Sequence, residues 1–450
     1  MADQRLRMMK GQKSRSANDL LGRNLLALLS IGVSTSIVVA WVASSYYSVD
    51  VVASLIWPGD DGYCDAKSDG FGRHCFSDLA MYLGLGVSMD PEGLANSVKF
   101  YPPLNRLGFL FFQFVASAFG PEIATLIYVA LSALCLMVPA LWAGRGKALW
   151  ERTLIASLAG FLTFPFLATV DRGNNIAFAV PVILVFAIAL QRRKWAVAVA
   201  AIVIGSQIKP QLGLLALGFV VVRRYKVFIV TVCLSIGLFL MSFLVFAVAP
   251  GRLSPLQEFK DFILYTRYFD EYLPLTDLYP INLSFVHLVG LFWEGFGIGV
   301  ATTDTIQWLI YGLIGLALAM LVWRGESLEI GVWFPAMLMG VLLMPNPVFA
   351  YYLGGALVCS SFFFRQPFST QIAGAHPAIR WLLTIAVVVS LSPLLIPGGW
   401  TEAPGETLGS GAVVSLLPRF ASFVWLAYVL AVALSGLRRW NKSRGVGKSC

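Results

Sequence analysis

The sequence predicts an all-α polytopic membrane protein with about 12 transmembrane helices, because the chain carries many apolar runs of membrane-crossing length. The chain is 58% hydrophobic and 13% charged, whereas soluble domains are about one quarter charged. Its apolar residues form long runs, and a bilayer core about 30 Å thick needs roughly 20 such residues in a helix. The alternating segments of about ten residues that typify membrane β-barrels do not occur in it.

Each predicted span is a nearly charge-free run between polar gaps. The predicted spans are residues 25–47, 121–143, 153–170, 175–190, 195–207, 212–222, 227–249, 305–323, 330–345, 350–364, 380–397 and 412–436. Two further apolar segments, 104–119 and 282–300, begin and end on the same side if the charge pattern holds. We expect them to be re-entrant or juxtamembrane helices on the outer side.

The net charge of +9 comes from basic clusters in every second gap between the apolar runs. The clusters lie at residues 5–23, 145–152, 192–194, 223–226, 324, 365–380 and 438–448. Basic residues concentrate in cytoplasmic loops, so this distribution predicts a multi-pass protein of the cell inner membrane with both termini in the cytoplasm. The charge therefore sets orientation, and no nucleic-acid partner is expected.

The same pattern predicts the domain organisation. Residues 1–24 form a basic cytoplasmic N-terminus, 25–437 a single transmembrane domain, and 438–450 a basic cytoplasmic tail. The first run is expected to be a retained span, the alternative being a cleaved signal peptide. Two long outer loops span 48–103 and 250–304. Cys64 and Cys75 lie in the first loop and are candidates for a disulfide, which an oxidising exterior favours.

Lys209 interrupts an apolar stretch in the sequence Gln207-Ile208-Lys209-Pro210-Gln211. The residue before a proline avoids the helical region, so the chain is predicted to turn here. Irregular backbone and a charge at membrane depth are tolerated only against protein or a water-filled cavity, which predicts a cavity that opens outward. A buried ammonium group favours an anion such as a phosphate; alternatively, Lys209 extends to the lipid headgroups.

Three other polar groups on the predicted outer side are candidates for chemistry. Asp78 could act as a general base or cap the helix that begins there. Arg106 follows the helix-starting prolines of Tyr101-Pro102-Pro103 and could bind phosphate or extend to headgroups. Arg172 offers a planar fork suited to phosphate, unless Asp171 neutralises it.

The sequence also excludes several classes of chemistry. No phosphate-binding glycine loop and no nucleotide-binding glycine motif occurs in it. Its three histidines are scattered, and no His/Cys pair has metal-ligand spacing. The serine-hydrolase elbow motif is missing as well. ATP-driven pumps, hydrolases and metal-dependent enzymes are therefore disfavoured, and neither a metal nor a cofactor is expected.

The order of the motifs resembles glycosyltransferase family 87 of the GT-C superfamily of membrane enzymes. The motifs are Asp78 with Tyr82, Tyr101-Pro102-Pro103-Leu104, Arg172-Gly173-Asn174-Asn175, Ile208-Lys209-Pro210 and Asn282-Leu283-Ser284. Leu283 stands where the family has glutamine, and the family's Gly-Gln-x-Asn is one residue shorter here. The histidine that the family often carries after the ninth span is replaced around residues 347–352.

The resemblance implies a GT-C type fold and a polyprenyl-phosphate-sugar-dependent hexosyltransferase of the cell envelope. It implies mannose as the sugar of the donor, and a glycolipid or glycan as the acceptor. It implies transfer on the outer face of the membrane, with the lipid-linked sugar phosphate as donor substrate and membrane lipids around it. It also places Asp78 as the base of a single displacement. Arg172, Lys209 and Arg106 would bind the donor phosphate. Further substrate-binding candidates are Tyr82, Tyr101, Asn174, Asn175, Gln211, Asn282 and His287.

Two other classes of function fit the same features. Broken helices with polar groups at mid-depth also occur in transporters, so a lipid-linked oligosaccharide flippase is one alternative. An enzyme of the O-antigen ligase or polymerase type is the other, and it would use a diphosphate donor.

Overall fold

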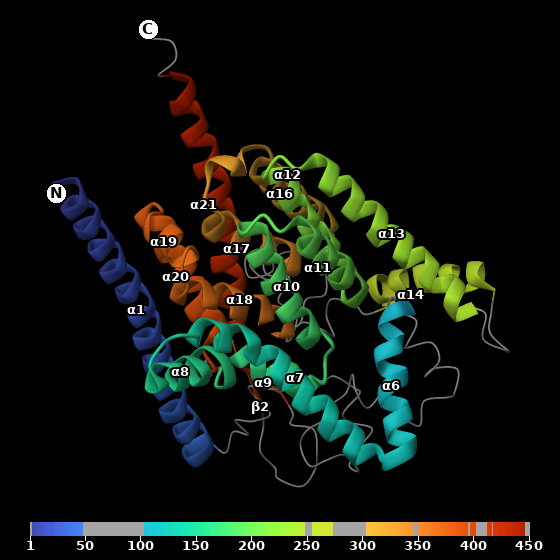
Figure 1. The fold of residues 1–450 in the computed structure, drawn as a ribbon. Coiled ribbons are helices and arrows are strands. Elements are labelled where there is room, and N and C mark those ends of the chain that lie inside the picture. Colours follow the sequence, from blue (N-terminus) through green and yellow to red (C-terminus); the bar gives the residue numbers. More distant parts are fainter. Residues whose placement is uncertain are drawn as a thin grey trace.

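The computed structural model describes residues 2–47, 103–247, 254–272, 303–344, 350–394, 397–401, 412–415 and 417–445. Figure 1 shows α17 and α18 near the centre, with α1 on one flank and α6 and α13 on the other. The N-terminal half contains α1 (Ala2–Tyr47), α6 (Pro103–Phe119), α7 (Pro121–Gly144), α8 (Leu149–Ala156), η2 (Ser157–Phe161), α9 (Phe164–Arg172), α10 (Ile176–Gln191), α11 (Trp195–Ile208), η3 (Pro210–Ala216), α12 (Leu217–Val221) and α13 (Tyr225–Ala247).

The C-terminal half adds more helices and a pair of short strands. Its elements are α14 (Pro255–Tyr272), α16 (Thr303–Arg324), η5 (Gly325–Ser327), α17 (Ile330–Leu343), η6 (Ala350–Gly354), α18 (Gly355–Ser361), η7 (Phe362–Phe364), α19 (Phe368–Ala373), α20 (Pro377–Leu391), β1 (Pro397–Thr401), β2 (Ala412–Ser415) and α21 (Leu417–Gly445). The helical fold class is thus confirmed over the described residues.

The predicted number of about 12 spans is not confirmed. Among the described residues, 5 helices are long and apolar enough to cross a membrane: Leu20–Tyr46, Pro121–Gly144, Tyr225–Leu244, Trp308–Ser327 and Leu417–Leu437. A sixth candidate is the pair Leu149–Phe161 and Phe164–Arg172, which is bent by 56° within the span predicted at 153–170. The other predicted spans are helices of 10–17 residues, shorter than the roughly 20 residues that a bilayer core requires.

The strand pair β1–β2 and helix α14 of the C-terminal half were not predicted. β1 and β2 pair antiparallel, with Trp400 opposite Val413, so the last long helix begins at Leu417 instead of residue 412. The loop predicted at 250–304 contains α14, whose first turn is capped by Ser254 Oγ, which accepts a hydrogen bond of 3.3 Å from the Gln257 amide.

α14 is held against α13 by aromatic side chains. The ring of Phe243 lies 5.4 Å from that of Phe259 and 5.9 Å from that of Phe262, and Phe239 lies 5.5 Å from Phe262. Edge-to-face pairs of this kind stabilise by about 0.5–1.5 kcal/mol beyond the area that they bury. This contact places the start of the loop predicted at 250–304 beside the membrane-length helix α13.

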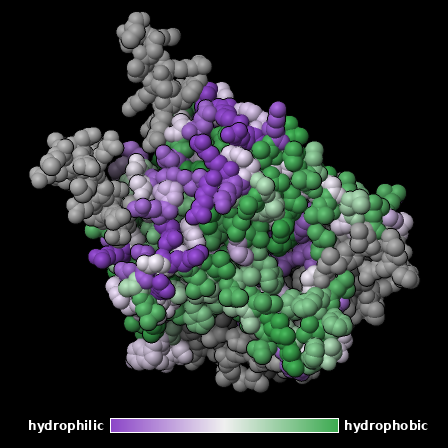
Figure 2. Space-filling view, viewed as in Figure 1, coloured by the Kyte–Doolittle hydropathy of each residue, from purple (hydrophilic) through white to green (hydrophobic). Residues whose placement is uncertain are grey.

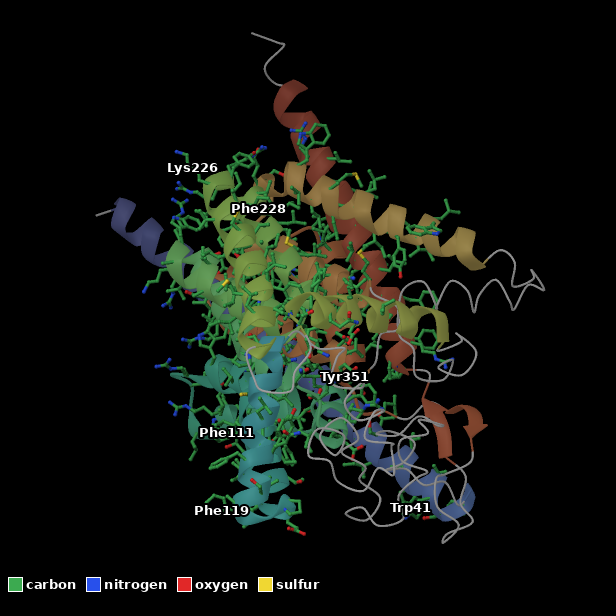
Figure 3. All side chains as sticks on the ribbon, turned by 90° about the vertical axis from the view of Figure 1, so that its right-hand side faces the viewer. Trp41, Phe111, Phe119, Lys226, Phe228 and Tyr351 are labelled. Atoms are coloured by element: carbon green, nitrogen blue, oxygen red, sulfur yellow. The ribbon has the colours of Figure 1, made fainter. Side chains whose placement is uncertain are left out.

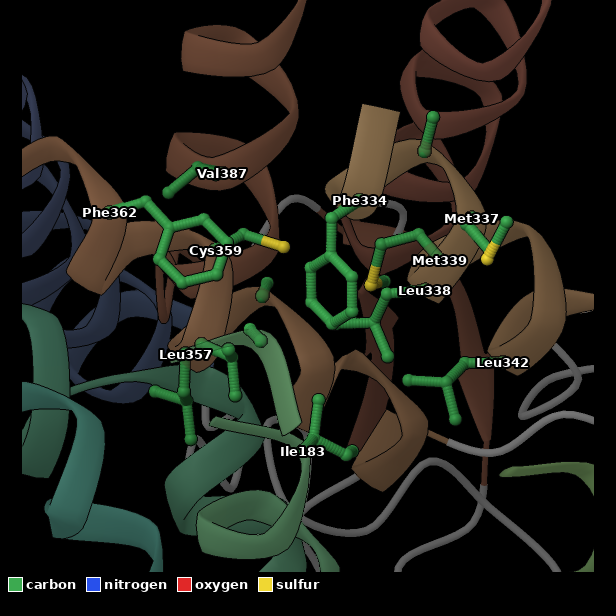
Figure 4. Packing of buried hydrophobic residues seen from close by; sticks show 14 of the residues in the cluster. Ile183, Phe334, Met337, Leu338, Met339, Leu342, Leu357, Cys359, Phe362 and Val387 are labelled. Carbon is green, nitrogen blue, oxygen red and sulfur yellow. The ribbon is translucent and has the colours of Figure 1, made fainter. Parts of the chain in front are cut away.

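The centre of the fold is α17, in which every residue from Gly331 to Leu343 is buried. Its Phe334 ring lies 6.0 Å from the Phe362 ring (Figure 4). The Phe362 ring in turn stacks on the Phe368 ring at 4.2 Å. Large apolar side chains on α1, α6, α7, α13 and α16 are instead exposed. An apolar core inside an apolar outer surface is the pattern expected of a membrane protein.

The basic loops meet at one end of the molecule. Arg365 Nη1 donates to the Arg145 carbonyl at 2.6 Å, and Arg223 pairs with Glu326 at 2.7 Å. Gln371 Nε2 lies 3.3 Å from Gln191 Oε1. Helix α1 begins and α21 ends at this end, where Figure 2 shows hydrophilic residues gathered. The predicted grouping of these loops on one side therefore agrees with the geometry, while the identity of that side stays a prediction.

The close approach of α17 and α18 at Gly355 generates a stability prediction. A Cβ at position 355 would lie 2.6 Å from Leu342 Cδ1 and 2.8 Å from Met339 Sδ. Overpacking of this kind costs about 1–3 kcal/mol, so Gly355→Ala should lower the melting temperature of the purified protein. The matched control is Gly237→Ala in α13, where nothing lies within 4 Å. The control should retain or raise the melting temperature, and an equal loss in both variants would contradict the packing argument.

Candidate functional site

Lys209 lies at the break between α11 and η3. Its backbone is extended, with φ −138° and ψ 112°, so α11 ends at Ile208 and the next segment begins at Pro210. This confirms the turn that the proline predicts. The Lys209 side chain is only 6% exposed. The ammonium group is therefore held inside the protein among apolar helices, as the sequence-based argument for a functional lysine requires.

The ammonium group of Lys209 lies against the rings of two tyrosines of η6. Lys209 Nζ lies 5.7 Å from the centre of the Tyr351 ring and 5.6 Å from that of Tyr352. The two rings are 4.9 Å apart, and both tyrosines are buried. A cation within about 6 Å of an aromatic face is attracted by the negative face of the ring. Figure 3 shows Tyr351 between the end that carries Lys226 and the opposite end with Phe119 and Trp41.

Arg172 lies at the end of a helix that packs against the same segment, η6. It is the last residue of α9, which packs against η6, and it interacts electrostatically with Tyr351. Arg172 is partly buried, and Asp171 beside it is 7% exposed. The structure therefore places two of the predicted phosphate-binding cations, Arg172 and Lys209, on elements that meet at η6.

The turn after Arg172 is fixed by a buried hydrogen bond. Gly173 adopts a left-handed conformation, with φ 66° and ψ 31°, which glycine reaches without a steric penalty. The Tyr128 hydroxyl donates to the Gly173 carbonyl at 2.8 Å. The Tyr128 ring in turn lies between Phe112 at 4.9 Å and Phe178 at 5.5 Å. Helices α6, α7 and α10 thus jointly hold the end of α9.

The two asparagines after this turn differ in their surroundings. Asn174 Oδ1 accepts a 3.0 Å hydrogen bond from the Ile176 amide and thereby supports the start of α10. Asn175 is 3% exposed, and neither its Nδ2 nor its Oδ1 has a hydrogen-bond partner among the described residues. Because an unsatisfied buried amide is costly, Asn175 is the better candidate of the two for binding substrate hydroxyls.

The start of α6 touches the break at Lys209. Asn105 Nδ2 donates to the Ile208 carbonyl at 3.2 Å, which joins the Pro-Pro-Leu-Asn-Arg motif to the Lys-Pro motif. Arg106 follows in α6, but its side chain lies outside the described part of the structure. Gln207 is buried, and its Nε2 lies 3.3 Å from the Ser235 carbonyl. Gln211 is half-buried on the far side of the break.

The remaining predicted residues lie outside the described residues, and their roles stay predictions. They are Cys64, Cys75, Asp78, Tyr82, Tyr101, Asn282 and His287. The re-entrant segment predicted at 282–300 lies there as well. Within the described ranges, no group of three His, Cys, Asp or Glu residues could hold a metal ion.

Sequence reasoning missed Tyr351, Tyr352, Tyr128 and Asn105. Adjacent tyrosines inside the apolar run at 350–364 were the available signal, because polar groups at membrane depth are costly and mark functional sites. A cavity of about 250 Å³ lined in part by Glu329, Gln371 and His376 lies elsewhere. Neither Arg172 nor Lys209 lines it, so it does not belong to this candidate site.

Comparison with known proteins identifies the class of enzyme. The pattern of glycosyltransferase family 87 matches residues 100–345, which are more than half of the 450 residues. The chain belongs to glycosyltransferase family 87. The matched region contains Asn105, Arg172 and Lys209 but neither Asp78 nor Tyr351. No curated protein and no solved structure gives a significant match.

The hydrogen bond from Tyr128 to the Gly173 carbonyl generates a second prediction. Tyr128→Phe removes the hydroxyl donor and leaves the buried Gly173 carbonyl without this hydrogen bond. The free energy of unfolding should fall by about 1–3 kcal/mol. We expect a lower melting temperature and weaker binding of substrate, because the turn that carries Arg172 loosens. Tyr46→Phe is the control, since Tyr46 is 71% exposed. A Tyr128→Phe protein as stable as the Tyr46→Phe control would contradict the proposed role of this bond.

Proposed function

We propose that this glycosyltransferase transfers a hexose, in the first instance mannose, from a polyprenyl-phosphate sugar to a lipid or glycan acceptor. Transfer takes place on the outer face of the cytoplasmic membrane by single displacement. The observation that carries the proposal is that η6, whose two tyrosine rings lie against the buried Lys209, packs against α9, which ends at Arg172.

The donor chemistry explains why two cations are needed at this depth. When the sugar leaves a polyprenyl phosphate, negative charge develops on the departing phosphate, and preorganised cations in a site that excludes water stabilise it strongly. Arginine can bind two phosphate oxygens in a fork, while lysine acts as a point charge. The exposed apolar faces of α6 and α13 supply walls along which a polyprenyl chain can lie.

Asp78 completes this mechanism as the base that accepts the proton of the attacking acceptor hydroxyl. A single displacement requires one base and no carboxylate nucleophile. Asn175 is proposed to bind sugar hydroxyls through its amide, which can both donate and accept. The family membership disfavours the flippase alternative, and the diphosphate donor of a ligase-type enzyme is distinguished by testing a panel of donors.

The basic loops support the sidedness of the proposal. They meet at the end where α1 begins and α21 ends (Figure 1), and basic loops face the cytoplasm. Tyr351 and Lys209 then lie toward the middle of the protein, within reach of a donor that enters from the outer leaflet.

Removing either cation should impair use of the donor. Arg172→Ala and Lys209→Ala each remove a charged hydrogen bond, which contributes about 1.5–3 kcal/mol and hence a loss of about ten- to 150-fold in kcat/KM. The assay uses the purified enzyme with polyprenyl phosphomannose and a glycolipid acceptor. Lys194→Ala, in an exposed basic loop, is the matched control. Unchanged kcat/KM in both site variants would remove the basis of the proposal.

Replacing the proposed base should abolish transfer without unfolding the protein. Asp78→Asn retains the size of the side chain and its capacity to cap a helix but cannot accept the acceptor's proton, so kcat should fall by about 100-fold or more. Binding of polyprenyl phosphate should persist, because this step does not use the carboxylate. Asp78→Asn protein with normal turnover would show that another group is the base.

A further inference from the structure

Tyr351 lies against one of the proposed phosphate-binding cations, on an element that packs against the helix ending at the other. Its ring face lies 5.7 Å from Lys209 Nζ, and it interacts electrostatically with Arg172. These two cations come from different parts of the chain, Lys209 from the break after α11 and Arg172 from the end of α9. Tyr351 is therefore the residue through which their relative positions can be set.

Tyr352 provides an internal comparison. Its ring lies 5.6 Å from Lys209 Nζ, almost the same distance as that of Tyr351. Segment η6 packs against α9, which ends at Arg172, and Tyr351 is the tyrosine of the pair that acts electrostatically on Arg172. A role in holding Lys209 alone would be shared by the two tyrosines, whereas a role in coupling Lys209 to Arg172 belongs to Tyr351.

We propose that Tyr351 is a positioning residue that holds Arg172 and Lys209 at the spacing needed to bind one phosphate group together. The proposal rests on the proposed function, because it assumes that these cations bind the donor's phosphate. It adds a residue outside the region that matches the family.

The chemistry of a phenol suits this task. Two cations repel each other, so a group between them must attract both. The ring face attracts the ammonium group, and the hydroxyl oxygen can accept a hydrogen bond from the guanidinium group. A carboxylate would attract both cations more strongly, but it would neutralise them and compete with the phosphate. A neutral tyrosine orients the cations and leaves their charge for the donor.

The geometry around η6 makes this orientation rigid. Tyr351 and Tyr352 are 7% and 8% exposed, and their rings pack 4.9 Å apart. A Cβ at Gly354 would lie 3.5 Å from Val180 Cγ2, so η6 also lies close against α10. With its side chain buried on a segment held by α9 and α10, Tyr351 has a fixed position toward which both cations can be drawn.

A double-mutant cycle tests the proposal. The dissociation constant of polyprenyl phosphate is measured for the full-length protein in lipid nanodiscs, with neutral polyprenol of the same length as the blank. The first cycle combines Tyr351→Phe with Arg172→Ala, and the matched cycle combines Tyr352→Phe with Arg172→Ala. Residues that act through one another give non-additive effects, whereas independent residues add.

Tyr351→Phe retains the ring and loses the hydroxyl. In the unaltered background it should weaken polyprenyl phosphate binding by about three- to tenfold. In the Arg172→Ala background it should weaken that binding by less than about twofold. Tyr352→Phe should have the same effect in both backgrounds. Tyr351→Leu should bind more weakly than Tyr351→Phe, because Lys209 loses the ring. That difference should vanish in the Lys209→Ala background.

Additive effects in the Tyr351 cycle would overturn the inference. If Arg172→Ala and Lys209→Ala themselves leave polyprenyl phosphate binding unchanged, the proposed donor site fails instead, so the two failures are distinguishable. Melting temperatures establish which variants are folded. If Tyr351→Phe does not fold, Tyr351→His replaces it in the same cycle at pH 8. Additive effects of Tyr351→His and Arg172→Ala would then overturn the inference.

Discussion

Burial of the Lys209 ammonium group is the constraint around which the site is organised. A charge inside an apolar protein is costly unless it is paired or otherwise stabilised, and Lys209 is only 6% exposed. Two tyrosine rings that lie against the ammonium group help to stabilise it. The break before Pro210 brings the lysine to this position, and Asn105 satisfies the Ile208 carbonyl beside it.

The elements that line the site are short or interrupted for the same reason. The span that leads to Arg172 bends by 56°, and Arg172 itself ends α9 at a left-handed glycine. Irregular backbone at membrane depth is tolerated where it is buried in protein or lines a cavity. Tyr128 supplies the hydrogen bond that this turn needs. Long helices such as α13 and α21 form the frame, and the broken ones present polar groups in its interior.

Local features of the sequence predicted the local features of the site. Pro210 predicted the break at Lys209, and the end of the predicted span 153–170 lies close to Arg172, where α9 ends. The number of spans was not predictable in the same way, because α10, α11 and α17 are apolar helices that are shorter than the roughly 20 residues a bilayer core needs. Helix α17 is apolar because it is buried in protein, and hydropathy cannot separate that case from contact with lipid. Tyr351 was missed because its partners, Lys209 and Arg172, lie far away in the sequence.

The most direct test of the central claim is an experimental structure of the protein in lipid nanodiscs with polyprenyl phosphate bound. The account predicts that the phosphate lies between Lys209 and Arg172, with an oxygen about 2.7–3.2 Å from each side chain. Tyr351 should then lie beside both cations, and the polyprenyl chain should run outward along the apolar surface. A phosphate bound at the basic loops near Arg145 and Arg365, with Lys209 contacting only the tyrosines, would contradict the account.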